Sequence, residues 1–196
     1  MEIGIFIYQE AEVLDFAGPY EVFSTADRLL SSATFNPFLI SQNGGLVQTR
    51  GGFEVNTKSI NEVNKLDILI VSGGVHKNIV GNLSVESWLK EISQEVVYLV
   101  SICTGVFLLA SSGCLTSGRV TTHWEDQHEL SIQYPTLDVI SDYRWVQQGK
   151  IFTSGGIAAG IDLSLHLVSI ISGELIANRT AKQMEVTWHR AHEKTW

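Results

Sequence analysis

EVVYLVSICTGVFLLASSG, residues 95–113, is the stretch on which the predicted fold rests. It opens with a short apolar run, Val96–Ile102, typical of a strand that is buried on both faces inside a parallel sheet. A turn at Cys103-Thr104-Gly105 follows, and then an apolar helical segment, Val106–Ala110, that closes at Ser111-Ser112-Gly113. The order strand, sharp turn, helix predicts that the thiol of Cys103 lies at a helix N-terminus.

A thiol in that position is a candidate nucleophile. The free backbone amides and the positive end of the helix dipole favour an anion there, and thiols so placed can have a pKa lowered from about 8.5 to roughly 3.5–7.5. The alternative is a small buried hydrophobic residue, as most free cysteines are. Thr104 and Gly105 suit a tight turn that brings the backbone close to a ligand. A disulfide with Cys114 is not expected, because a helix between the two would separate them by on the order of 16 Å.

Composition predicts one globular domain over residues 1–196. The chain is 44% hydrophobic and 17% charged, which suits a substantial core. A net charge of −8 and a pI near 5.2 argue against direct binding of nucleic acid and against an anionic membrane surface. Two cysteines without an expected disulfide, a start lacking a basic signal-peptide region, and no run of roughly 18 apolar residues predict a cytoplasmic protein.

Apolar runs and breaks divide the first half into alternating strands and helices. We expect strands at Ile3–Tyr8, Phe38–Ser41, Asp67–Ser72 and Val96–Ile102, helices from Pro19 to about Leu30 and over Val85–Ser93, and hairpins within Asn43–Thr57. This alternation predicts an α/β fold with a mostly parallel sheet and helices on both faces.

The second half is less regular. A helix is expected over His123–Gln133, short strands at Asp138–Ile140, Tyr143–Val146 and Ile151–Thr153, a long helix over Ile157–Ile171, and a last helix from Glu174 to about His189.

Motifs for bound cofactors are weak. Gly73-Gly74 and Gly155-Gly156 stand where a phosphate cradle would stand, but neither belongs to a GxGxxG or Walker A pattern. The six histidines form no HExxH motif, and two cysteines cannot supply a thiolate zinc cluster. We therefore expect no cofactor and no metal.

Several motifs together resemble the ThiJ/PfpI superfamily. They are LDFAGPYEVF (residues 14–23), SGG (72–74), SICTGVFLLASSG (101–113), Gly118-Arg119 followed by TTHW (121–124), and TSGGIAAGIDLSLHLV (153–168). The resemblance implies a flavodoxin-like three-layer sandwich related to class I glutamine amidotransferases. Within the superfamily the sequence looks most like isocyanide hydratases and the ligand-sensing domain of AraC-type transcription regulators.

The resemblance identifies Cys103 as the elbow nucleophile and Asp15 as its acidic neighbour. Many relatives carry Glu at the latter position, and the isocyanide hydratase branch carries Asp. Local sequence alone favours a helix-capping or turn residue at Asp15 over a catalytic one. The carboxyl ends of parallel strands meet at one edge of a sheet, where ligands bind, and this favours the catalytic interpretation.

Other positions follow from the same resemblance. Thr104 matches the residue after the nucleophile in isocyanide hydratases, whereas peptidase-like members have His there, so a protease is not expected. Gly74 and Val75 match a loop whose amides face the nucleophile as an oxyanion element; the alternative is a plain turn. His123 either approaches the cysteine or packs beneath the site. Asp162 is expected to be a structural hydrogen-bonding residue.

Two classes of function remain open on these grounds. The first is a cofactor-free, cysteine-dependent enzyme that hydrates an isocyanide to an N-substituted formamide through a thioimidate on Cys103. The second is a sensing module with an idle or redox-active cysteine; a glyoxalase-, deglycase- or amidase-like activity is a further alternative. In each case the expected partner is a small molecule, and the resemblance implies a homodimer.

Overall fold

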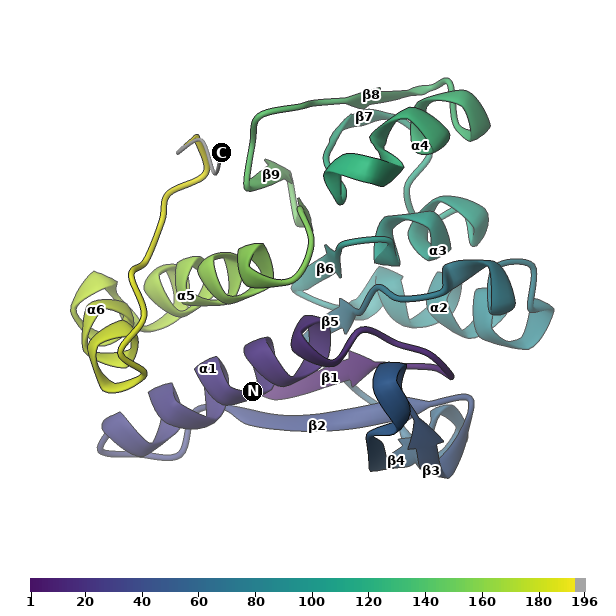
Figure 1. Ribbon diagram of the computed structural model, residues 1–196. Helices are drawn as coiled ribbons and strands as arrows, with labels where there is room; N and C mark the ends of the chain where they lie inside the picture. The colour runs from purple at the N-terminus through teal and green to yellow at the C-terminus, as the bar shows by residue number, and fades with distance from the viewer. Residues whose placement is uncertain (193–196) are drawn as a thin grey trace.

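An eight-stranded sheet forms the middle layer of the molecule (Figure 1). The computed structural model describes residues 1–192. The strands are β1 (Glu2–Phe6), β2 (Asn36–Ser41), β3 (Asn43–Gln48), β4 (Glu54–Ser59), β5 (Ile68–Val71), β6 (Tyr98–Ile102), β7 (Gly118–Val120), β8 (Leu137–Val139), β9 (Trp145–Gln148) and β10 (Ile151–Ser154). The helices are α1 (Val13–Leu29), α2 (Leu83–Glu95), α3 (Gly105–Ser111), α4 (Gln127–Gln133), α5 (Ala158–Ser172) and α6 (Glu174–Gln183).

The centre of the sheet is parallel, as the apolar runs predicted. The strand order is β3-β4-β2-β1-β5-β6-β10-β9, and the only antiparallel pairs in this sheet are the hairpins β3–β4 and β9–β10 at its two edges. All four residues of β5 are buried, which explains why its sequence lacks alternation. The carboxyl ends of β1, β5, β6 and β10 therefore lie at one edge.

Helices cover both faces, so the predicted three-layer α/β fold is confirmed. On one face α1, α5 and α6 bury Phe23, Leu163 and Ala177 against the sheet. On the other face α2, α3 and α4 bury Leu89, Val106 and Leu130. Figure 1 shows the two groups of helices on opposite sides of the strands. Each group lies against alternate side chains of the same strands, which is the packing expected of buried parallel strands.

Three helix boundaries differ from the prediction by four residues or more, and one of them is the start of α4, at Gln127 and not at His123. Helix α1 begins at Val13 rather than near Pro19, which lies inside the helix. The first turn therefore contains Asp15, which is a helical residue and not a turn residue. Helix α6 ends at Gln183 and not near His189, because the chain reverses at Glu185, whose φ is 55°.

A small second sheet was not predicted. Strand β7 pairs in parallel with β8 over three residues. The sequence Gly118-Arg119-Val120 is too short and too polar to stand out, and the strand is fixed by its surroundings: the amide of Arg119 donates to Gln148 Oε1 at 2.7 Å. This pair carries the chain from α3 back to the edge of the main sheet where Cys103 lies.

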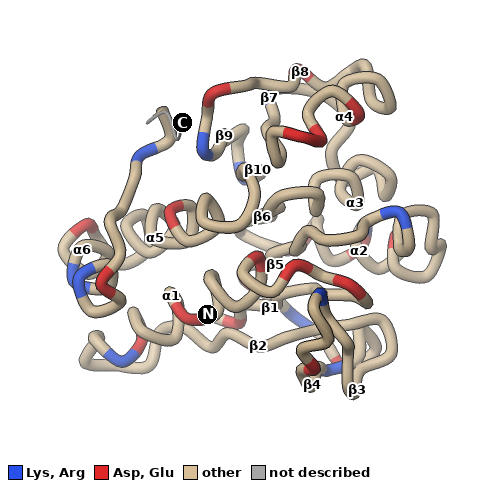
Figure 2. Tube along the Cα trace, viewed as in Figure 1, with Lys and Arg blue, Asp and Glu red and all other residues tan. Residues whose placement is uncertain are grey.

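Charge is distributed over many elements. Figure 2 shows Lys and Arg at scattered positions along the trace rather than gathered on one face of the described residues. The net charge of the whole chain is −8. Within residues 1–192, none of the helices is both long and apolar enough to cross a membrane.

Candidate active site

Cys103 occupies a sharp elbow between β6 and α3, as predicted. Its φ is 54°, a left-handed conformation that costs a residue with a side chain about 1–3 kcal/mol and is held only by its surroundings. The amide of Cys103 donates to Ser154 O at 3.2 Å, and its carbonyl accepts from Thr122 Oγ1 at 2.7 Å. Gly105 lets the helix approach β5: a Cβ there would be 2.2 Å from Val71 O. The elbow is therefore fixed from three sides.

Asp15 lies beside the thiol in complete burial. Its side chain is 0% exposed, on the first turn of α1. Oδ1 accepts from the amide of Ile157 at 2.9 Å, and Oδ2 accepts from the amide of Gly73 at 3.2 Å. The carboxylate also lies beside the Cys103 side chain, across Gly73. No Lys or Arg of the described residues forms an ion pair with it. The sequence prediction that Asp15 adjoins Cys103 agrees with this geometry.

Burial of Asp15 and Cys103 changes the pKa of both side chains. Burial raises the pKa of Asp15 to about 7, although the amide of Ile157 and the thiol of Cys103 act in the opposite direction. Burial also raises the pKa of the Cys103 thiol, and the negative charge of Asp15 raises it further, while the Thr104 amide lowers it. The expectation of a lowered thiol pKa is therefore wrong for this closed site, because desolvation outweighs the start of a seven-residue helix.

Gly73 sets the spacing of the pair. A Cβ at this position would lie 2.6 Å from Asp15 Oδ2, 2.6 Å from Cys103 Cβ and 2.8 Å from the Thr104 amide nitrogen. These atoms leave no room for any side chain. The glycine that ends the β5 run is thus required by close contact between the carboxylate and the elbow, not by a left-handed turn.

Thr104 ties the elbow to the loop after β5. Its hydroxyl donates to Gly74 O and accepts from Gly74 N, both at 2.9 Å. The amide of Val75 donates to Glu10 O at 3.1 Å. Both amides of the expected oxyanion element, at Gly74 and Val75, are therefore already engaged, and their hydrogen bonds do not support that role. The amide of Thr104 is instead the backbone donor beside the Cys103 sulfur, where it lowers the pKa of the thiol.

A cleft of about 410 Å³ opens over Cys103. Its walls carry Thr104, Val75, His123, Asp126 and Ile157, together with the polar residues Glu12, Arg50, His76, Lys77 and Glu125. Gly156 separates the sulfur from the imidazole: a Cβ on it would lie 3.2 Å from Cys103 Sγ and 2.5 Å from His123 Cδ2. His123 is therefore a neighbour of the thiol, which was one of its two predicted positions.

Ile157 closes the far wall of the cleft in a strained conformation. Its φ is 56° and its ψ is −101°, which are unfavourable for a β-branched residue. Its amide is the donor to Asp15 Oδ1, and its side chain is 41% exposed. In this backbone conformation the amide of Ile157 reaches the Asp15 carboxylate. Helix α5 therefore does not begin in the ordinary way. The Gly155-Gly156 pair gave no indication of this strain.

Three polar residues of the site were missed by sequence reasoning. Asp126 lies 3.5 Å from His123 Nδ1 (Oδ2 to Nδ1), and His76 stacks on Phe107 in the cleft wall. Tyr8 follows β1 with a buried hydroxyl that makes no hydrogen bond, and burial raises its pKa. Asp126 could have been found from the sequence, because it lies only three residues after His123. His76 and Tyr8 had none, because only the tertiary fold brings them to the elbow.

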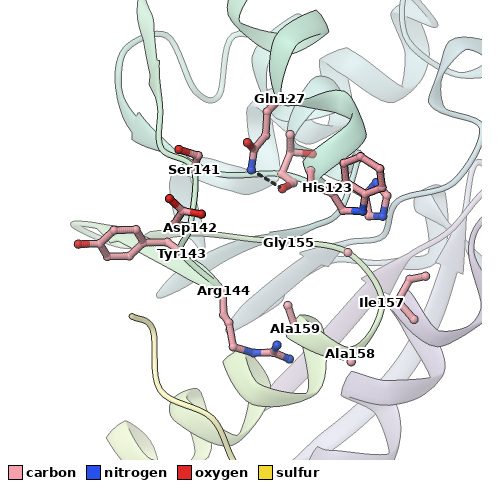
Figure 3. Close-up of a pocket in the computed structure, with 13 residues that line it drawn as sticks. His123, Gln127, Ser141, Asp142, Tyr143, Arg144, Gly155, Ile157, Ala158 and Ala159 are labelled. Atoms are coloured by element: carbon pink, nitrogen blue, oxygen red, sulfur yellow. Dashed lines mark hydrogen bonds between the residues drawn. The ribbon is translucent and has the colours of Figure 1, made fainter. Parts of the chain in front are cut away.

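A second cavity lies behind the His123 wall (Figure 3). Its volume is about 330 Å³, and it shares His123 and Ile157 with the cleft. Figure 3 shows Asp142 and Gln127 at one side, and Ala158 and Ala159 at the other, from α5. Trp124, which also lines the cavity, is 61% exposed. The cavity is thus mainly apolar where it borders α5.

Asp162 is structural, as predicted. Its Oδ2 accepts from Arg144 Nε at 2.7 Å and also contacts Arg144 Nη2, while Oδ1 accepts from the amide of His189 at 2.9 Å. Its backbone carbonyl accepts from Trp188 Nε1. The ion pair attaches the segment before β9 to α5, and the hydrogen bonds from Trp188 and His189 attach the segment after α6 to the same residue.

The second cysteine is not part of the site. Cys103 and Cys114 are both free, as predicted. Cys114 follows the C-terminal end of α3 and contacts the hydroxyl of Ser112 at 3.1 Å. No group of three or more His, Cys, Asp or Glu within residues 1–192 is arranged to hold a metal ion.

Comparison with known proteins gives three concordant results. The sequence model of the DJ-1/PfpI family matches residues 1–170. An isonitrile hydratase of Pseudomonas putida is 31% identical over 191 residues, which are 94% of this chain and 78% of that protein. The HTH-type transcriptional regulator CdhR of Pseudomonas aeruginosa is 28% identical over 172 residues; they are 87% of this chain but 51% of the regulator.

A solved structure agrees in fold. The crystal structure of a THiJ/PfpI family protein from Pseudomonas syringae superposes with a TM-score of 0.83 at 20% identity, covering 94% of this chain and 74% of that one.

Proposed function

The chain belongs to the DJ-1/PfpI family, and from this premise we propose that it is a cysteine-dependent enzyme that hydrates isocyanides to N-substituted formamides. One observation carries the proposal. Asp15 is fully buried, has no cationic partner among the described residues, holds a pKa of about 7 and lies beside the Cys103 thiol. A carboxyl group with that pKa can both accept and return a proton near neutral pH.

The first step transfers the thiol proton through Asp15. The carboxylate takes the proton from Cys103 as the sulfur attacks the terminal carbon of R–N≡C, and an S–C bond forms. The carbon then takes the same proton back from Asp15, which leaves the thioimidate Cys103–S–CH=N–R. A raised thiol pKa is no obstacle here, because the base lies beside the thiol and the proton leaves only as the new bond forms.

The second step consumes one water molecule. Water adds to the thioimidate carbon, the C–S bond breaks, and the products are HC(=O)–NH–R and the free thiol. Thr104 supports both steps, since its amide lies beside the sulfur and its hydroxyl holds the Gly74 loop against the elbow. Charge that develops at sulfur in either step is thus stabilised by a fixed backbone donor.

The substituent R lies in the cleft or toward the apolar cavity beside it. The P. putida isonitrile hydratase supports this substrate class, and the absence of a histidine after Cys103 supports a non-peptidase reaction. We further propose a homodimer and a small-molecule substrate rather than a nucleic acid. Ile157 in the cleft wall and Leu14 next to Asp15 in α1 are 41% and 37% exposed, and these apolar side chains support a partner subunit nearby.

The direct test is turnover of an alkyl isocyanide, followed by NMR of the formamide proton. We expect formamide from the wild-type chain and none from Cys103→Ala, which removes the nucleophile. Methylglyoxal serves as the competing substrate, because a glyoxalase- or deglycase-like enzyme would consume it. Turnover of methylglyoxal without formamide formation would refute the proposed hydration.

A sensing module is the second candidate. Two observations favour it: CdhR matches this chain over about half its own length, and burial raises the pKa of the Cys103 thiol. In that case the cleft binds an effector and no product forms. Saturable binding of a small molecule without turnover of either substrate would favour the sensor.

A further inference from the structure

A third cavity lies beside β9, the last strand of the main sheet. Its volume is about 520 Å³, which is within the usual range for a site that binds a small molecule. One wall is the segment after α6, which Figure 1 shows running toward β9. The amide of Arg144 joins the two through a hydrogen bond to Ala191 O at 3.0 Å. The cavity shares no lining residue with the cleft over Cys103, so it is a separate space.

The walls of this cavity carry positive charge, although the net charge of the chain is −8. Arg119 of β7 and Arg190 of the segment after α6 both line it, and no Asp or Glu of residues 1–192 does. Arg119 is exposed, and its register neighbour in β8 is Asp138. Neither Asp138 nor any other carboxylate of the described residues forms an ion pair with Arg119. The charge of this arginine is therefore available to an anion in the cavity.

Arg190 is already ordered by its neighbours. Its Cζ lies 3.6 Å from the centroid of the Trp188 ring, and its guanidinium pairs with Glu174. Burial lowers the pKa of His166 in the cavity wall, and the positive charge of Arg190 lowers it further, so this charge is felt in the cavity. A guanidinium held in this way loses little conformational freedom when it binds an anion.

Planar rings form much of the remaining wall. The rings of Trp145 and His166 stack with their centroids 4.1 Å apart, and Tyr143 meets His192 edge to face at 5.5 Å. The Cζ of Arg119 lies 5.7 Å from the centroid of the Tyr143 ring, so a cation and an aromatic ring stand together. The indole N–H of Trp145 is a buried donor that has no hydrogen-bond partner among residues 1–192. The wall thus combines flat apolar surface with donors.

We propose that this cavity is a second binding site of the chain and that it takes a small aromatic carboxylate. The carboxylate pairs with Arg119 and Arg190, since the planar fork of a guanidinium matches a carboxylate through two parallel hydrogen bonds. The aromatic ring of the ligand lies against Tyr143 and Trp145. Because Glu174 already pairs with Arg190, the two guanidiniums leave one uncompensated positive charge, which suits a monoanion better than a dianion. The inference does not depend on the reaction proposed at Cys103.

The test compares 2-naphthoate with 2-naphthamide, which has nearly the same shape and no charge. Isothermal titration calorimetry measures the affinity of the whole chain for each compound. Proton–nitrogen NMR follows the indole signal of Trp145, which is assigned by its absence in Trp145→Phe. We expect naphthoate to bind about ten-fold more tightly than the amide and to shift the Trp145 signal. Equal affinities, or no binding of naphthoate at millimolar concentration, would overturn the proposal.

Arg119→Gln tests the charge that the ligand is proposed to meet. We expect it to weaken naphthoate binding about ten-fold and to leave naphthamide binding unchanged. Arg28→Gln is the matched control, because it removes the same charge from α1, where Arg28 pairs with Glu21 outside the cavity. This control should bind naphthoate as the wild type does. An equal loss of affinity in both variants would indicate attraction to the overall charge of the chain and would overturn the proposal.

Alkylation of Cys103 distinguishes the cavity from the cleft. Complete reaction with iodoacetamide, checked by mass spectrometry, places a carbamidomethyl group in the cleft, which the cavity does not share. We expect the alkylated protein to bind naphthoate with unchanged affinity and with the same shift of the Trp145 signal. Weaker binding after alkylation, or naphthoate binding that is unchanged by Arg119→Gln, would place the ligand elsewhere and refute the proposed site.

Discussion

Asp15 and Asp162 are two buried carboxylates that the fold treats in opposite ways. They are 0% and 3% exposed. Asp162 faces the guanidinium of Arg144 and so forms a neutral pair. Asp15 accepts from two backbone amides and lies beside a thiol, but no Lys or Arg of the described residues pairs with it. A buried charge without a counter-ion reduces stability, and it is retained where the group has chemical work to do.

The pair also shows how a carboxyl group becomes a useful base. Removal from water without a counter-ion raises the pKa of Asp15 to about 7. Burial raises the pKa of Asp162 as well, but the amide of His189 and the guanidinium of Arg144 act in the opposite direction. Replacement of each Asp by the nearly isosteric Asn separates the two roles, and the predictions below use this.

The largest effect is expected for Asp15→Asn on turnover. Asn cannot accept the thiol proton, so formamide production should fall by about 10²–10⁴-fold. The measurement is steady-state turnover of an isocyanide, with the circular dichroism spectrum as the control for folding. Wild-type turnover in this variant would make Asp15 a structural residue like Asp162.

Asp162→Asn should act on stability instead. Removal of the negative charge leaves the Arg144 guanidinium buried without its partner, which typically costs about 3–5 kcal/mol. Chemical denaturation should show a lower free energy of unfolding, whereas turnover per folded molecule should stay near that of the wild type. A stable Asp162→Asn variant would contradict the structural role of the ion pair.

The pH dependence of stability should separate the wild type from Asp15→Asn. The folded pKa of Asp15, about 7, lies above its ordinary value of 3.8, so its contribution to stability is complete below about pH 4 and is lost as pH rises through 7. The full difference is about 4 kcal/mol. Denaturant unfolding at pH 4 to 8 should show this decline in the wild type relative to the variant. Parallel curves would mean that Asp15 ionises normally.

Much of the fold could be predicted from sequence because its signals are local. Apolar runs such as Ile68–Val71 and the turn after Ile102 placed the central strands and Cys103. The start of α1 was misplaced, because Pro19 resembles a first-turn proline although it lies inside the helix. The counter-ion of Asp162 was also out of reach, because Arg144 meets it only through tertiary packing.

The site was less predictable for the same reason. Cys103 and Asp15 were found together through family motifs, but their burial could not be read from spacing, and burial reverses the expected shift in the thiol pKa. The hydrogen bond between Thr104 and Gly74 joins residues 30 positions apart. It occupies an amide that sequence reasoning had left free for a negatively charged intermediate.

Alkylation of the thiols should show a smaller effect, in which Asp15→Asn raises a rate instead of lowering it. The negative charge of Asp15 raises the pKa of Cys103, so Asp15→Asn should increase its thiolate fraction. We expect iodoacetamide to label Cys103 about ten-fold faster in the variant at pH 8.5, if the pKa falls by about one unit. Mass spectrometry of each peptide supplies the rate, with Cys114 as the internal reference. Slower labelling would show that Asp15 assists ionisation at rest.

Tyr8→Phe should have the smallest effect. The Tyr8 hydroxyl is buried without a hydrogen bond, so its removal breaks no contact and should change the free energy of unfolding by less than about 1 kcal/mol. Thermal or denaturant unfolding checks this. A larger loss of unfolding free energy would mean that the hydroxyl has a hydrogen-bond partner, such as a buried water, that supports the elbow.

The crowding around Gly73 has a consequence for how such a site can change over generations. A methyl group on Gly73 would collide with the Asp15 carboxylate, Cys103 and the Thr104 amide, so no single substitution at this position leaves all three in place. Gly73 can therefore be exchanged only together with a change in one of these three neighbours. The exposed walls of the cleft carry no such restriction. New substrates are thus accessible to a lineage by gradual steps, whereas a new catalytic pair is not.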